Sequence, residues 1–161
     1  MAGSTTKKVI VRRYEKEALA GWVNPASYLQ PSGIEVLLPD GRTSVTVPYE
    51  EVKAVSFVRE FSSLESERRA FLTRPKMTGL WVNLRFRDGE SLEGILPNNL
   101  LLIDPQGFTV IPPDPFGNQQ RVFIPRGSLS AMEVLGVVGS PLTKRKPKPA
   151  AKEQIGLFEE E

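Results

Sequence analysis

Cysteine and histidine are both absent from this sequence of 161 residues. Without cysteine the chain can form no disulfide and has no thiolate nucleophile. Without histidine it lacks the side chain whose unperturbed pKa lies closest to neutral pH. These absences exclude Ser-His and Cys-His nucleophile pairs and zinc sites built from cysteine and histidine. We therefore expect a non-enzymatic protein that holds no metal and no cofactor.

Long apolar runs are absent as well. No stretch approaches the roughly 18 apolar residues that a transmembrane helix needs, and the opening MAGSTTKK lacks the apolar region of a secretory signal. The net charge is only +2, and the pI of about 9.0 is a weak indication of an anionic partner. We expect a cytoplasmic protein, with enough apolar residues (40%) for a packed core.

The most informative feature that is present is an internal repeat. The segment VIVRRYEKEALAGWVNP, from Val9, aligns without a gap with VNLRFRDGESLEGILPN, from Val82, at an offset of 73 residues. Next, QPSGIEVLLP matches DPQGFTVIPP at an offset of 74, and VTVPYEEVKAVSFV matches VFIPRGSLSAMEVL at an offset of 77. The jump of three falls in a loop between two predicted strands, where insertions are tolerated. The sequence therefore predicts a tandem duplication of one structural unit.

Both copies have the pattern of short β-strands. Apolar and polar residues alternate at the start of each copy, as in half-buried strands. Asp88-Gly89 predicts a tight turn, and Gly21 and Gly94 indicate a bulge or a sharp bend inside a strand. Each copy then has about five strands in roughly 50 to 55 residues, a length that is marginal for independent folding. We therefore expect the two copies to pack against each other through a shared apolar face.

The predicted fold class is all-β, with two tandem five-stranded small barrels. The predicted parts are a first barrel over residues 7–60, a connector over 61–79, a second barrel over 80–139 and a disordered tail over 140–161. In the connector, Ser62 and Glu65 have the spacing of a capping box, and Leu64 and Phe71 share one face of a helix. These features predict a short connecting helix or a partly ordered linker.

Three segments of the second copy, VNLRFRDGESLEGIL, NNLLLID and FIPRGSLSAMEV, resemble the Sm and Sm-like proteins. Those proteins fold as small five-stranded barrels, and many bind RNA as rings. The resemblance depends on alternating apolar residues, two glycines and an Arg-Gly pair: Val82, Leu84, Gly89, Gly94, Leu96, Ile124, Arg126 and Gly127. It covers residues 82–134, and the first copy only in pattern. The duplicated arrangement also resembles a bacterial family of tandem small-barrel domains that has no known activity.

The Sm resemblance implies a site for RNA or another single-stranded nucleic acid. In that family an asparagine reads a base edge and the Arg-Gly pair holds the opposite side. Asn98 or Asn99, with Arg126 and Gly127, stand at the matching positions. The only candidate for base stacking is Phe116, in the proline-rich loop. The alternative interpretation is that Asn98-Asn99 and Arg126-Gly127 are ordinary turn residues with no binding role.

The last residues form a segment of different composition. TKRKPKPAAKE carries five basic residues and two prolines, so it predicts a disordered linker that solubilises the chain or touches nucleic acid electrostatically. The following QIGLF resembles the pentapeptide by which bacterial replication and repair proteins bind the DNA polymerase sliding clamp.

In that motif Gln154 and Ile155 occupy the glutamine and aliphatic positions, and Leu157 and Phe158 are the anchors for an apolar pocket. The alternatives are that the motif folds back onto a barrel or has no role. The sequence thus predicts an adaptor tethered to the sliding clamp, with nucleic-acid binding by the barrels as the alternative function.

Overall fold

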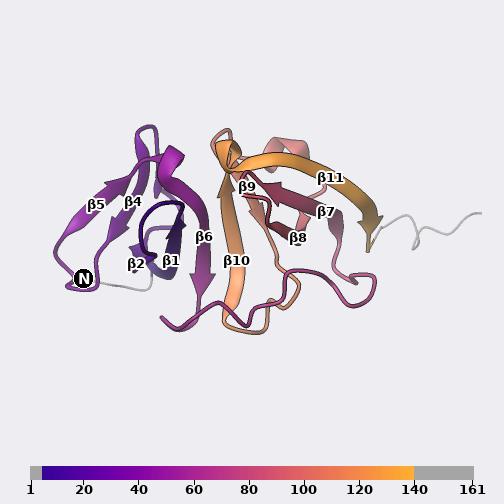
Figure 1. The fold of residues 1–161 in the computed structure, drawn as a ribbon, viewed down its shortest axis with the longest axis horizontal. Coiled ribbons are helices and arrows are strands. Elements are labelled where there is room, and N and C mark those ends of the chain that lie inside the picture. The colour runs from indigo at the N-terminus through magenta and orange to yellow at the C-terminus, as the bar shows by residue number, and fades with distance from the viewer. Residues whose placement is uncertain (1–4, 140–161) are drawn as a thin grey trace, which may run out of the picture.

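The computed structural model describes residues 5–139 and confirms an all-β fold (Figure 1). The strands of the first half are β1 (Lys7–Arg13), β2 (Leu19–Val23), β3 (Leu29–Gln30), β4 (Gly33–Leu37), β5 (Ser44–Val47) and β6 (Val52–Val58). Those of the second half are β7 (Gly79–Phe86), β8 (Ser91–Leu96), β9 (Gly107–Val110), β10 (Gln119–Pro125) and β11 (Leu129–Val138). Single 3₁₀ turns occur at η1 (Tyr49–Glu51), η2 (Leu100–Leu102) and η3 (Arg126–Ser128). None of the helices in residues 5–139 is long and apolar enough to cross a membrane.

The two halves pair their strands in the same order, as a duplicated sequence requires. In the first half the order is β6–β1–β2–β4–β5, with the short β3 added beside β4. In the second half β11–β7–β8 form a three-stranded sheet, a single bridge joins Ile95 to Ile111, and β9 pairs with β10. Figure 1 shows the strands of each half curling around an interior.

The halves are joined by strand pairing. The last strand of the first half, β6, pairs antiparallel with β10, so that Val55 lies opposite Phe123 and Ser56 opposite Val122. This pairing extends the first sheet into the second half and gives a single sheet of eight strands. The sequence predicted contact through an apolar face, whereas the structure shows the halves joined by a backbone hydrogen-bond ladder whose register shifts between Gln119 and Arg121.

Each half has its own buried core, and at the junction each half contributes a side chain to the core of the other. The first core contains Val9, Val11, Val23, Tyr28, Ile34, Val36, Val47, Val52, Val55, Phe57 and Phe123. The second contains Ala54, Val82, Leu84, Phe86, Leu92, Leu96, Phe108, Val110, Val122 and Ile124. Phe123 of β10 thus lies in the core of the first half, while Ala54 of β6 lies in the core of the second. This exchange follows from the alternation of side chains along paired strands.

Gly21 and Gly94 allow a neighbouring strand to approach closely, and neither residue lies in a β-bulge. The register with the neighbouring strand runs without a shift through both residues, so the bulge interpretation is wrong. A Cβ atom built on Gly21 would lie 2.6 Å from the carbonyl oxygen of Leu37, and one on Gly94 would lie 2.8 Å from Val110 Cβ. Only glycine lets the next strand pack this closely at these positions.

The predicted connecting helix is wrong, because residues 61–78 form turns and bends. Two aromatic contacts to different strands hold the segment. Phe61 packs edge-on against Trp22 of β2 at 5.8 Å between ring centroids, and Phe71 packs against Trp81 of β7 at 6.3 Å. These tertiary contacts override the local helix signals, which are weak determinants in a segment this short.

Candidate functional site

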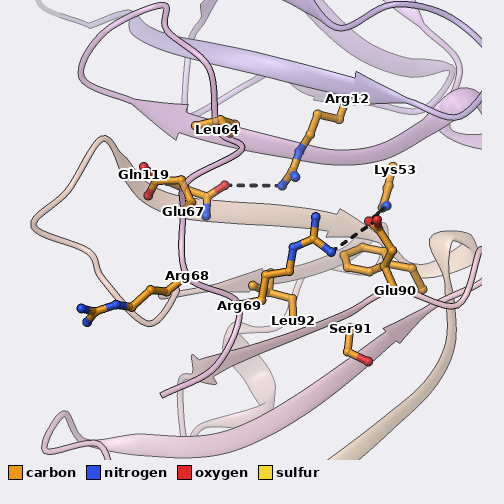
Figure 2. Close-up of a pocket in the computed structure, with 11 residues that line it drawn as sticks. Arg12, Lys53, Leu64, Glu67, Arg68, Arg69, Glu90, Ser91, Leu92 and Gln119 are labelled. Carbon is orange, nitrogen blue, oxygen red and sulfur yellow. Dashed lines mark hydrogen bonds and ion pairs between the residues drawn. The ribbon is translucent and has the colours of Figure 1, made fainter. Parts of the chain in front are cut away.

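A partly buried arginine lies where the two halves meet. Arg12 of β1 points away from the first core, and its Nη2 donates to Ser56 Oγ at 3.2 Å and to Gln119 Oε1 at 3.4 Å. Ser56 Oγ donates in turn to Gln119 Oε1 at 2.6 Å. Ser56 and Gln119 are fully buried on β6 and β10. Figure 2 shows the Arg12 guanidinium between these strands and the connector.

Arg12 has no carboxylate partner among the ion pairs of residues 5–139. Its Nε is buried and has no hydrogen-bond partner in the described part of the chain. Burial lowers the pKa of Arg12, the positive charge of Arg69 lowers it further, and Glu90 acts in the opposite direction. A largely desolvated cation without a counter-charge is costly, which makes this arginine a candidate for binding an anion.

Two of the carboxylates near Arg12, those of Asp88 and Glu90, are engaged by other cations. Lys53 of β6 pairs with Asp88 at 2.7 Å and also with Glu90, and Arg69 Nη1 lies 3.3 Å from Glu90 Oε2. Hydrogen bonding to Lys53 is the main reason that the pKa values of Asp88 and Glu90 are lowered. Both carboxylates therefore stay ionised and paired, and neither closes on Arg12.

Arg12 faces two hollows. A void of about 20 Å³, large enough for one water molecule, lies between Arg12, Arg69 and Glu90 (Figure 2). A larger cleft of about 440 Å³ opens beside it and is also lined by Arg12 and Arg69. Its floor consists of Ile10 together with two small residues, Ala18 and Ala20.

The connector forms the other wall of the cleft and is fixed at both ends. At its start, Asn118 Oδ1 accepts from the backbone N–H groups of Arg59 at 3.0 Å and Glu60 at 2.8 Å. Near its end, the Glu93 carboxylate accepts from the Phe71 N–H at 3.1 Å and from Trp81 Nε1 at 3.0 Å. The stretch between these anchors lies over the cleft.

A model of a family of unknown function, DUF6982, matches residues 5–136. The chain belongs to this family. The DUF6982 match covers both halves of the fold, the connector and every residue of the cleft. No curated protein and no solved structure matches the chain.

The residues predicted for nucleic-acid binding all lie inside the DUF6982 match, in two turns. Asn99 caps η2, because its Oδ1 accepts from the Leu101 N–H at 3.1 Å. Arg126 begins η3 and lies over the ring of Phe108, with its guanidinium carbon 4.7 Å from the ring centroid. Within residues 5–139 no hydrogen bond or ion pair joins Asn98 or Asn99 to Arg126 or Gly127.

Phe116, the predicted stacking residue, is 88% exposed. The residues of the predicted clamp motif, Gln154, Ile155, Leu157 and Phe158, lie outside both the described residues and the DUF6982 match.

Sequence reasoning missed Arg12 because alternation along a strand places it on the face away from the core, where a charged residue is normally solvated. Its burial depends on β10 and the connector, which are distant in the sequence. The alignment of the two copies did not indicate this burial either, because Arg12 aligns with Arg85, which is exposed.

Proposed function

We propose that this protein is a non-enzymatic adaptor that acts in the cytoplasm and is tethered to the DNA polymerase sliding clamp by QIGLF. The observation that carries this proposal is the sequence itself. Gln154, Ile155, Leu157 and Phe158 match each specified position of the clamp-binding pentapeptide. Leu157 and Phe158 supply the large apolar anchors that short linear motifs use to fill a pocket.

We also propose that the body attached to this motif is a pair of small barrels derived from one duplicated unit. The common order of strand pairing in the two halves supports this interpretation. In this proposal the segment TKRKPKPAAKE is the linker between body and motif. Its five basic residues would keep the protein close to the DNA that the clamp encircles.

The clamp proposal predicts that a labelled peptide of residues 152–161 binds a purified bacterial sliding clamp with micromolar affinity in a fluorescence anisotropy titration. Replacing Leu157 and Phe158 by alanine should weaken binding by at least about tenfold, because each anchor contributes on the order of 2 kcal/mol. Glu160→Gln, outside the pentapeptide, is the matched control and should leave the affinity nearly unchanged. The full chain should show the same ranking. A wild-type peptide that does not bind the clamp would disprove the proposal.

Nucleic-acid binding by the body is the alternative function. It is supported by the exposed guanidinium of Arg126, which is held over Phe108. Arg126→Ala should then lower affinity for a labelled single-stranded oligonucleotide several-fold, while the matched charge removal Arg42→Ala, on an exposed turn of the first half, should not. Affinity should also fall steeply as salt rises. No binding at low salt would eliminate this alternative and leave the clamp proposal untouched.

A further inference from the structure

We propose that the cleft beneath the connector is a binding site for a small organic anion. The anionic group would lie against Arg12 and Arg69, and the apolar part would lie on Ile10, Ala18 and Ala20. This site is independent of the clamp motif and of the two turns that carry Asn98 and Arg126.

The charge at the cleft selects an anion. Of the charged residues in the described range 5–139, two arginines, Arg12 and Arg69, and one acidic residue, Glu65, line the cleft. Figure 2 shows their side chains directed toward one another from β1 and from the connector. Among residues 5–139, Arg69 forms an ion pair with Glu90 alone, and the Arg12 guanidinium donates only to neutral groups. An anion in the cleft, beside both arginines, would relieve their mutual repulsion and give the largely buried Arg12 the counter-charge that it lacks.

Two serine hydroxyls of the connector complete the polar side of the site. Ser62 Oγ accepts from Asn118 Nδ2 at 3.1 Å, and Ser63 Oγ accepts from the Glu65 N–H at 3.2 Å. Because both oxygens are acceptors in these bonds, both hydroxyl hydrogens can be donated to an anion. Both serines line the same cleft as the two arginines.

The floor and the size of the cleft select an organic anion over a bare inorganic ion. Ile10 and Ala20 are directly paired across β1 and β2, so their side chains lie together on the outer face of the sheet. The methyl groups of Ala18 and Ala20 leave space that larger side chains would fill. The volume of about 440 Å³ lies within the range of small-molecule sites, which runs from roughly 300 to 1,000 Å³. A phosphate or carboxylate group alone would occupy only its polar end.

The test uses the full chain labelled with nitrogen-15 and phenyl phosphate as the probe. The Nε–H signal of Arg12 should shift in a saturable way as phenyl phosphate is added. Phenol has the same ring without the charge, and inorganic phosphate has the charge without the ring. Both should bind at least about tenfold more weakly, which corresponds to about 1.4 kcal/mol.

Two variants locate the site without touching Arg12, whose removal disturbs the junction. Ala20→Leu fills the floor and leaves every charge in place, and it should weaken phenyl phosphate binding by about tenfold or more. Arg69→Gln removes one cation and should weaken it by roughly fivefold. Arg74→Gln is the matched control, because Arg74 lies on the connector outside the cleft and donates to the carbonyl of Val137. It should change the affinity by less than about twofold.

The proposal is overturned if phenyl phosphate gives no saturable shift of the Arg12 signal at about 10 mM, which is well above a millimolar dissociation constant. It is also overturned if binding occurs but Ala20→Leu and Arg69→Gln leave it unchanged, since the probe then binds elsewhere. Thermal unfolding of each variant checks that a loss of binding is not a loss of fold.

Discussion

Phe123→Ala is expected to lower the free energy of unfolding by about 3–5 kcal/mol, a large part of the stability of a domain of this size. The Phe123 side chain is fully buried, and it packs edge-on against Tyr28 at 6.0 Å between ring centroids. The loss combines the transfer of a large apolar ring with the cavity that remains. Urea denaturation followed by tryptophan fluorescence measures it. The matched control is Phe116→Ala, which changes an exposed ring and should shift stability by less than about 0.5 kcal/mol.

The strands that lose hydrogen-exchange protection in Phe123→Ala show whether the two halves unfold together or as independent domains. Phe123 is supplied by β10 of the second half but belongs to the core of the first. Hydrogen exchange in Phe123→Ala should therefore accelerate in β1, β2 and β4 as well as in β10, and unfolding should remain a single transition. Faster exchange confined to the second half would show that the exchanged side chain does not couple the two cores.

The all-β fold class could be predicted from the sequence because it depends on local alternation and turn residues. The junction could not, because the alignment of the two copies does not state which strands of different copies pair. Positions at which the two copies differ in polarity do indicate the junction. Phe123 aligns with Thr46, and Ser56 aligns with Glu133. At both positions the junction has a residue suited to burial where the other copy has a polar or charged one.

The candidate site was harder to predict than the fold for the same reason. Its residues come from β1, β2, β6, β10 and the connector, and they form no local sequence motif. The connector was predicted to be a short helix or a partly ordered linker, whereas in the structure its turns form a wall of the cleft. Leu64 and Phe71, expected on one helical face, take separate roles: Leu64 lines the cleft and Phe71 packs against Trp81.

Gln119→Leu is expected to destabilise the protein by about 2–3 kcal/mol, even though it replaces a buried polar residue with an apolar one. Gln119 Oε1 accepts from both Ser56 Oγ and Arg12 Nη2. Its removal leaves the Ser56 hydroxyl and the partly buried Arg12 guanidinium with one acceptor fewer, and the cost of such a loss is largest for charged groups. Chemical denaturation of the single variant measures this cost. A change below about 0.5 kcal/mol would mean that water replaces the lost acceptor.

The triple variant Arg12→Met/Ser56→Ala/Gln119→Leu separates the structural part of this network from a binding role. Removing every polar member together leaves nothing unsatisfied, so its stability should return to within about 1 kcal/mol of the wild type. The same variant should no longer bind phenyl phosphate, because the buried cation is gone. Recovery of stability together with loss of binding would mean that folding does not require Arg12, whereas anion binding in the cleft does. A triple variant that remains as unstable as Gln119→Leu alone would instead assign the network to holding β1, β6 and β10 in register.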